Sequence, residues 1–264
     1  WDLLAKVKNE PVWRLLGYKK SYPKIPYASI LFGETPEETL DIAKKIISKG
    51  YKAVKFGWGP IGKSNFKVDA EHFIAAREGI GQDNYLMIDA GQIFKDDVNK
   101  AAERIPALET VRATWFEEPF HTYAYHAYSS FAKFQTSVKL AGGEGAHNVQ
   151  MANHLIEYGK VGYIQIDCGR IGGIAPGKKV AELADKNGIT YVNHTFTSHL
   201  ALSASLQPFA GLADHKICEF PANPKRLAYL ISSNYIEQNK HGEISAPNEV
   251  GLGIDVNLQR LKSF

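Results

Sequence analysis

Short apolar runs alternate along the chain with longer segments in which apolar residues recur every three or four positions. The runs are four or five residues long and rich in β-branched and aromatic residues, which is typical of parallel strands buried on both faces. They occupy residues 53–56, 85–89, 114–117, 138–141, 163–167, 189–192 and 216–219, and residues 27–31, just after Pro26, are expected to form a first strand.

The segments between these runs have the spacing of amphipathic helices. Residues 36–49 show it most clearly, because Thr35 is a suitable N-cap, Pro36 stands at the first helical position and Gly50 follows the last turn. Further helices are expected at 68–79, 96–108, 148–158, 174–187 and 198–211. Strand and helix alternating this often predict an α/β fold in which right-handed parallel units close into a TIM-type barrel.

Length and composition are consistent with this fold. The 264 residues are enough for one barrel and leave no room for a second large domain. With 44% hydrophobic residues and no bilayer-length apolar run, the sequence indicates a soluble globular protein with no membrane partner. The 31 basic and 28 acidic residues are mixed along the chain, which argues against a nucleic acid partner.

The two cysteines, Cys168 and Cys218, stand beside acidic residues at predicted strand ends. We interpret them as free, partly buried thiols of a protein in a reducing compartment, the cytoplasm, rather than as a disulfide or a nucleophile.

A polar residue stands at or just after most of the predicted strands. The seven residues follow one another at steps of 34, 28, 27, 23, 27 and 25 residues: Lys55, Asp89, Glu117, Glu144, Asp167, His194 and Glu219. Since the carboxyl ends of the strands of a βα-barrel meet at one rim, these side chains are predicted to converge there.

Three of them, Asp89, Glu117 and Glu144, come from consecutive predicted strands. Carboxylates this close raise one another's proton affinity unless a cation lies between them. All-oxygen ligation suits a hard divalent ion, most often Mg²⁺. Any one of these acids alone would be read as a solvated carboxylate at the start of a loop, and it is the set of three that indicates a metal site.

The remaining four residues suggest acid–base chemistry. Asp167 can fix the tautomer of His194, which makes the other imidazole nitrogen a general base. Lys55, across the barrel mouth, can offer a cation to a bound carboxylate or enolate. Glu219 can donate a hydrogen bond to an oxyanion if it is protonated, although for Lys55 and Glu219 a simple ion-pair role remains open. Three further histidines lie in loops after the Glu117 and Glu144 strands, where they could contact a substrate: His121, His126 and His147.

Several motifs occur together in a fixed order. They are Trp1-Asp2-Leu3-Leu4-Ala5-Lys6 with residues 11–17, Ala53-Val54-Lys55, Met87-Ile88-Asp89, Trp115-Phe116-Glu117-Glu118-Pro119, Gly143-Glu144, Asp167 with Ile171-Gly172-Gly173, His194 and Gly251-Leu252-Gly253. This ordered set resembles the enolase superfamily, and within it the mandelate racemase-like branch that is rich in acid-sugar dehydratases. The resemblance runs over essentially the whole chain.

The resemblance implies specific roles. Asp89, Glu117 and Glu144 would be Mg²⁺ ligands, Asp167 and His194 a catalytic dyad, and Glu219 would face the carboxylate side of the substrate. Members of the family abstract the proton α to a carboxylate and hold the enediolate on the metal. One departure concerns the racemase pattern Lys-x-Lys on the second strand, where this chain has Gly57 in place of the second lysine.

A second departure concerns the ends of the chain, because family members begin with an α+β capping domain of which Trp1 resembles only the end. We expect a TIM-type (β/α)7β barrel with remnants of this domain at the termini. Residues 1–24 would be the end of the capping region and a linker, residues 25–221 the barrel, and residues 222–264 a segment returning to the capping region.

The function expected from this resemblance is that of a Mg²⁺-dependent acid-sugar dehydratase, a hydro-lyase in which His194 takes the C2 proton and the C3 hydroxyl departs. Two alternatives stay open: a cycloisomerase or epimerase using the same enolate chemistry, and a non-catalytic barrel that binds sugar acids. The expected partners are a small-molecule sugar acid and further copies of the chain in a homo-oligomer.

Overall fold

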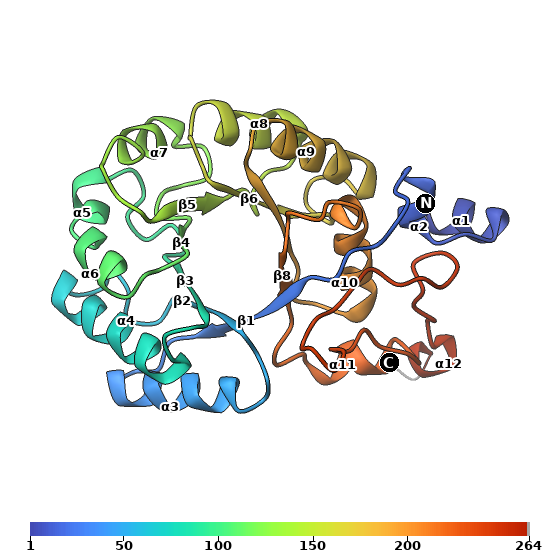
Figure 1. Ribbon diagram of the computed structural model, residues 1–264, viewed down its shortest axis with the longest axis horizontal. Coiled ribbons are helices and arrows are strands. Elements are labelled where there is room, and N and C mark those ends of the chain that lie inside the picture. Colours follow the sequence, from blue (N-terminus) through green and yellow to red (C-terminus); the bar gives the residue numbers. More distant parts are fainter. Residues whose placement is uncertain (263–264) are drawn as a thin grey trace.

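Eight parallel strands form the centre of the structure, a computed structural model that describes residues 1–262 (Figure 1). The strands are β1 (Ile25–Leu31), β2 (Ala53–Gly57), β3 (Tyr85–Asp89), β4 (Trp115–Glu117), β5 (Lys139–Gly142), β6 (Tyr163–Asp167), β7 (Thr190–His194) and β8 (Ile217–Phe220). Their order in the sheet is β7-β6-β5-β4-β3-β2-β1-β8, so each crossover places the next strand beside its predecessor until β8 returns to β1. The predicted barrel is therefore confirmed.

The seam between β7 and β8 is bridged by a side chain. Asn193 Oδ1 accepts a hydrogen bond from the Glu219 amide at 2.9 Å, and Asn193 Nδ2 donates to the Glu219 carbonyl at 3.2 Å. The buried amide thus imitates a backbone partner for β8 and draws the last two strands together.

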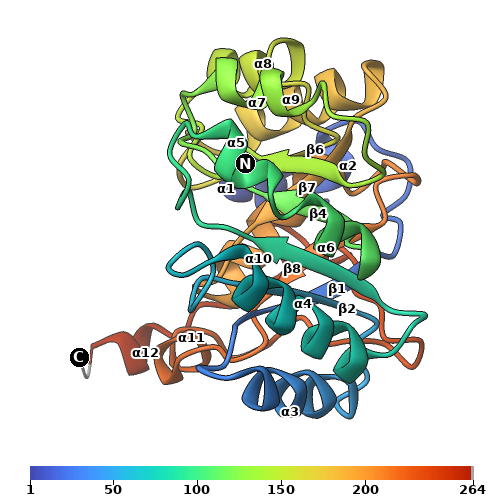
Figure 2. The same cartoon turned by 90° about the vertical axis from the view of Figure 1, so that its left-hand side faces the viewer.

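Helices surround the strands on the outside (Figures 1 and 2). They are α3 (Pro36–Ile47), α4 (Phe66–Ile80), α5 (Val98–Ala102), α6 (Ile105–Thr110), α7 (Tyr125–Phe131), α8 (Val149–Glu157), α9 (Ile174–Lys186) and α10 (His199–Leu206). The Thr35 cap is confirmed, because its side chain accepts from the Glu38 amide at 3.2 Å. The single helix expected at 96–108 is wrong, because a second helix, α6, begins at Ile105 with Pro106 in its first turn. Helix α7 was not expected at all.

The two ends of the chain lie together at one side of the barrel (Figure 1). They contain α1 (Asp2–Lys8) and α2 (Val12–Leu15) at the beginning, and α11 (Arg226–Leu230) and α12 (Leu258–Leu261) at the end. The Trp13 indole donates to the Pro247 carbonyl at 2.9 Å, and Pro11 pairs with Gly251 in an isolated bridge. Residues 1–24 and 222–262 therefore pack on each other as well as on the barrel.

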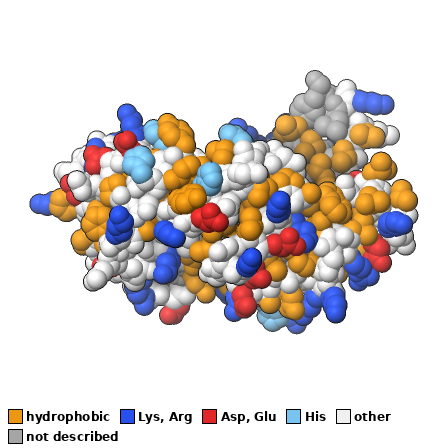
Figure 3. All heavy atoms as spheres, turned by 90° about the horizontal axis from the view of Figure 1, so that it is seen from above, with side chains coloured by type: hydrophobic (Ala, Val, Ile, Leu, Met, Phe, Trp, Pro, Cys, Tyr) orange, Lys and Arg blue, Asp and Glu red, His pale blue; other side chains and the backbone are white. Residues whose placement is uncertain are grey.

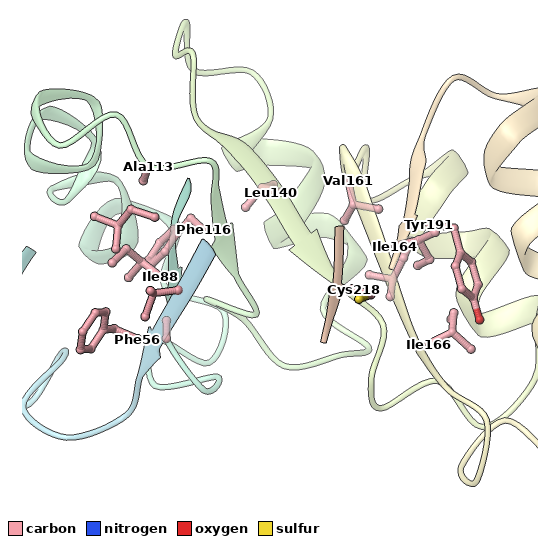
Figure 4. Close-up of a cluster of buried hydrophobic side chains, with 14 of the residues drawn as sticks. Phe56, Ile88, Ala113, Phe116, Leu140, Val161, Ile164, Ile166, Tyr191 and Cys218 are labelled. Atoms are coloured by element: carbon pink, nitrogen blue, oxygen red, sulfur yellow. The ribbon is translucent and has the colours of Figure 1, made fainter. Parts of the chain in front are cut away.

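Alternation along the strands separates two buried layers. Phe56, Ile88, Phe116 and Ile164 point outward from their strands toward the helices (Figure 4). A second set fills the inside of the barrel: Tyr27, Ala53, Met87, Trp115, Ala141, Val192 and Ile217. Because successive side chains of a strand point to opposite faces, residues an even number of positions from this second set point inward as well. Most of the predicted site residues have this parity.

The surface and the cysteines add two observations. Charged side chains of both signs are interspersed with hydrophobic ones over the face shown in Figure 3. Cys168 and Cys218 are free and buried, as expected, and burial raises the pKa of the Cys168 thiol to about 12. Among residues 1–262, no helix has both the length and the apolar character required to cross a membrane.

Candidate active site

The predicted site residues lie at the carboxyl ends of the strands. Six of them belong to strands β2, β3, β4, β6, β7 and β8: Lys55, Asp89, Glu117, Asp167, His194 and Glu219. Glu144 follows β5 by two residues and reaches back to the same rim. Contacts around Lys55 and around His194, joined by a 3.9 Å contact between His194 and Glu219, connect all seven side chains. The structure thus brings together every residue that the sequence placed at this rim.

Lys55 lies within a group of carboxylates. Its Nζ is 2.6 Å from Glu117 Oε1, 3.4 Å from Glu219 Oε1 and 3.5 Å from Asp89 Oδ2. Because Lys55 stands two residues before the end of β2, its ammonium group points into the barrel below the rim. Here it neutralises protein carboxylates, which is the ion-pair role that the sequence left open.

Burial and mutual repulsion shift the proton affinities of this group. Burial raises the pKa of Glu117 to about 8, against the attraction of Lys55, and the charge of Asp89 adds to the rise. Burial also raises the pKa of Asp89, with Glu144 contributing in the same direction. Burial alone would lower the pKa of Lys55, but the surrounding acids, Glu117 foremost, raise it well above its usual range. If all of these acids were ionised, they would therefore carry more negative charge than Lys55 alone can balance.

His194 is held between two carboxylates. Its Nδ1 is 2.8 Å from Asp167 Oδ2, and its Nε2 is 3.0 Å from Glu144 Oε2. Asp167 is itself fixed by the amides of Gly169 and Arg170, which donate to Oδ1 at 2.7 and 3.1 Å. Since an ionised carboxylate only accepts, Nδ1 carries a proton, and Nε2 is the nitrogen whose protonation can change.

Glu144 and His194 stabilise each other's charge. Burial would lower the pKa of His194, but the hydrogen bonds to Asp167 and Glu144 raise it to about 10. Burial would raise the pKa of Glu144, but His194, Lys55 and Arg170 lower it to about 2. With Glu144 against Nε2, the imidazole is therefore a cation and cannot serve as a base near neutral pH.

Glu219 is bound as an ionised carboxylate would be. One oxygen faces Lys55, and the other accepts the amide hydrogen of Thr195 at 2.6 Å. Both contacts come from donors, so the arrangement favours the ion-pair role over that of a protonated hydrogen-bond donor.

The donor set fits a hard divalent cation by charge and by atom type. Acidic side chains at the rim outnumber the basic ones, Lys55, Arg170 and His194, and they offer only oxygen ligands. As the side chains lie, no three His, Cys, Asp or Glu residues within 1–262 form a ready metal cluster. Ligation by Asp89, Glu117 and Glu144 would require Glu144 to turn away from His194 and Arg170.

Sequence reasoning missed three residues that shape this site. Arg170 binds Glu144 Oε1 at 2.9 Å, the Trp115 indole donates to Glu117 Oε2 at 2.9 Å, and Glu118 is buried beside them. Trp115 could have been found, because it stands two residues before Glu117 on the same face of β4. Arg170 and Glu118 carry no such signal, since their positions depend on loop conformation.

Gly57 has a structural reason. A Cβ atom built there would lie 2.9 Å from the Cβ of Asp89, the residue paired with Gly57 across β2 and β3. A lysine at position 57 would therefore displace Asp89. At the position of the second lysine in the racemase pattern, the chain thus has a glycine, which leaves room for the Asp89 side chain.

Two cavities flank the site. One, of about 380 Å³, is lined by Asp167, Arg170 and His194 together with apolar side chains of Ile174 and Phe196. The other, of about 430 Å³, shares Asp89 and Glu144 with the carboxylate cluster and has a more polar lining: Trp58, Gly91, Gln92, Ile93, Lys95, Glu118 and His121. A further cavity, of about 390 Å³, lies among the residues that begin β5, β6 and β7, at the other end of the barrel.

Comparisons with known proteins agree with this architecture. A family model described as "Enolase C-terminal domain-like" matches residues 38–260. The crystal structure of a predicted mandelate racemase from Rhodobacter sphaeroides superposes with a TM-score of 0.97 at 53% sequence identity, covering 100% of this chain and 68% of that chain.

Two curated relatives are more distant. The D-gluconate dehydratase of Thermoproteus tenax is 26% identical over 275 residues, covering 100% of this chain and 54% of that protein. The 3,6-anhydro-alpha-L-galactonate cycloisomerase of Streptomyces coelicolor is 26% identical over 266 residues, covering 99% of this chain and 68% of that protein. The chain thus spans between 54% and 68% of the lengths of these proteins.

Proposed function

We propose that this chain is the barrel of a Mg²⁺-dependent acid-sugar dehydratase. The proposal starts from its family: the chain belongs to the Enolase C-terminal domain-like family, in the mandelate racemase-like branch of the enolase superfamily. The observation that carries this proposal is the position of His194, which is oriented by Asp167 at Nδ1 and faces the carboxylate cluster with Nε2. The names of the gluconate dehydratase and the galactonate cycloisomerase support sugar-acid chemistry.

His194 is the residue that moves the proton. In the proposed reaction its Nε2 takes the proton from C2 of the acid, the C2–C3 double bond forms, and the C3–O bond breaks. The same Nε2 returns the proton to the departing hydroxyl, which leaves as water, and the enol product tautomerises to a 2-keto acid. Atoms and electrons balance with water as the only by-product.

Glu144 controls whether Nε2 is free. Its hydrogen bond is one of the causes that hold the pKa of His194 near 10, so its withdrawal lowers that pKa toward neutrality. Asp89, Glu117 and Glu144 are the residues that would hold Mg²⁺, and withdrawal of Glu144 would accompany that role. When bound, the ion supplies positive charge that stabilises the enediolate and polarises the carboxylate.

The test is a screen of hexarates, hexonates and pentonates with the full-length protein, read out by 2-keto acid formation. We expect at least one acid to lose water in the presence of Mg²⁺. A product isomeric with its substrate would indicate the cycloisomerase alternative instead. Absence of both product and C2 proton exchange across the library would contradict an enzymatic role and favour a binding barrel.

Removal of the metal is the first specific prediction. Chelation should abolish turnover and lower the melting temperature together, by roughly 5–10 °C if Mg²⁺ had been present at about 100 times its Kd. Both should return on adding Mg²⁺, as followed by calorimetry and by product assay on one sample. A metal-free preparation that turns over at full rate would contradict the ligand role of Asp89, Glu117 and Glu144.

A further inference from the structure

Backbone strain is concentrated around one cavity of the site. Four non-glycine residues that line the 430 Å³ cavity have positive φ angles: Trp58 at 58°, Gln92 at 65°, Lys95 at 56° and Glu118 at 36°. Only three other non-glycine residues of the described chain share this conformation. Left-handed backbone at such residues is unfavourable, persists where surrounding contacts impose it, and clusters at sites that bind or react.

Contacts between two loops impose this conformation. The Gln92 amide donates to the Glu118 carbonyl at 2.7 Å, the Phe94 amide to the Pro119 carbonyl at 3.2 Å, and the His121 amide to the Lys95 carbonyl at 2.8 Å. These bonds join the loop after β3 to the loop after β4, so the cavity wall they form is already built before any ligand enters.

The polar groups of the wall are oriented as well. Gln92 Nε2 donates to Glu118 Oε2 at 2.6 Å, so Gln92 Oε1 is the atom that faces His121 Nδ1 at 3.2 Å. Because Oε1 only accepts, Nδ1 carries the hydrogen, and Nε2 of neutral His121 is left as an acceptor. The half-exposed Trp58 ring packs over Gly91 and supplies an apolar surface beside these groups.

Lys95 is the cation of this cavity that remains available. Lys55 is used by three carboxylates and Arg170 by Glu144. Lys95 is exposed at the cavity, and in the part of the chain that the structure describes no acidic side chain forms a salt bridge with its ammonium group. The 380 Å³ cavity on the other side of His194 has a mainly apolar lining. It therefore suits the hydroxyl-bearing chain of a sugar acid poorly.

We propose that the cavity lined by Trp58, Gln92, Lys95 and His121 is the subsite for the end of the substrate remote from C2, and that Lys95 binds a second carboxylate there. His121 Nε2 accepts a hydrogen bond from a hydroxyl of the chain, and Trp58 packs against its C–H groups. The preferred substrates are then dicarboxylic sugar acids rather than monocarboxylic ones. This assignment rests on the proposed function, because it takes the first carboxylate to lie at the reaction centre.

The experiment compares a hexarate and a hexonate of the same configuration with the Mg²⁺-loaded full-length protein. In Lys95→Gln, the ratio of kcat/KM for the hexarate to that for the hexonate should fall about tenfold, mainly through KM, as expected for loss of one charged hydrogen bond. The matched control is Lys63→Gln, which removes the same charge from the neighbouring loop after β2, outside the cavity lining, and should leave the ratio unchanged.

Calorimetric binding to His194→Asn, which should bind without turnover, gives a readout independent of catalysis. Weaker hexarate binding in the double variant with Lys95→Gln would support the subsite. An unchanged ratio in Lys95→Gln, an equal change in Lys63→Gln, or no binding of a hexarate would overturn it. Lys95-dependent binding without turnover of any acid by the wild type would contradict the proposed function and leave the subsite standing.

Discussion

His194 and Lys55 each serve several carboxylates, and this sharing explains how so many acids occupy one barrel mouth. Lys55 contacts three acids, and His194 lies between Asp167 and Glu144, with Glu219 Oε2 at 3.9 Å from its Nε2. A buried carboxylate without a partner would be strongly unfavourable. The protein's own cations therefore offset part of the negative charge of these acids.

Replacement of the residue that orients His194 gives the second prediction about the reaction. Asp167→Asn should keep the fold while favouring the wrong imidazole tautomer, so kcat should fall by roughly 10²–10⁴-fold. The control is Asp185→Asn, which removes a similar contact, 3.2 Å from His215 Nε2, outside the site. A near-normal rate in Asp167→Asn, with an unchanged melting temperature, would move the base away from His194.

The sequence predicted which side chains meet and that Asp167 pairs with His194, but not the remaining pairings. Strand parity and spacing are local properties, so Asp89, Glu117 and His194 could be placed at one rim from the pattern alone. The pairing of Glu144 with Arg170, and the burial of Lys55 below the rim, depend on side-chain directions that only the closed barrel fixes.

The elements follow local signals where these exist. Helix α3 has a capping threonine and an N-terminal proline and was predicted within two residues. Helix α7 begins at Tyr125, its N-cap residue Ala124 has no side chain that could cap it, and no glycine ends it. Neither end therefore carries a sequence signal. The expected helix at 96–108 breaks because Pro106 lacks the amide hydrogen that a continuous helix would use there.

One buried ion pair holds an element that borders the site. Arg104 Nε donates to Asp69 Oδ2 at 2.9 Å, and Asp69, in the first turn of α4, accepts the Gly62 amide at 3.1 Å. The contact joins α4 to the segment before α6 and fixes the loop that follows Trp58. Burial raises the pKa of Asp69, and Arg104 opposes the rise.

Loss of Arg104 is predicted to destabilise the fold. Arg104→Met should lower the free energy of unfolding by about 3–5 kcal/mol, because Asp69 stays buried without its cation. The control Glu103→Gln removes an exposed partner of the same arginine and should change it by less than about 1 kcal/mol. Denaturant unfolding measures the free energy of unfolding of both variants. Equal losses in the two would contradict the view that Arg104 stabilises the fold by neutralising the buried Asp69.

The whole molecule is a barrel in which the candidate site lies at the carboxyl ends of the strands and the two chain ends pack at one side. The Asn193 side chain joins β7 to β8 through the backbone of Glu219, and His194 is the next residue of β7. The contact that closes the barrel therefore also positions two residues of the candidate site. The fold class could be predicted from periodicity, whereas the seam could not, because it depends on a side chain between strands distant from each other in the ladder.

In the proposed reaction His194 deprotonates C2 from one face only, because Gly57 stands where the racemase pattern has its second lysine. Proton exchange at C2, followed by NMR in D₂O with both C2 epimers of an accepted sugar acid, tests it most directly. We predict that Mg²⁺-loaded protein exchanges or eliminates one epimer only, and that His194→Asn does neither. Exchange of both epimers, or exchange that survives in His194→Asn, would contradict the claim.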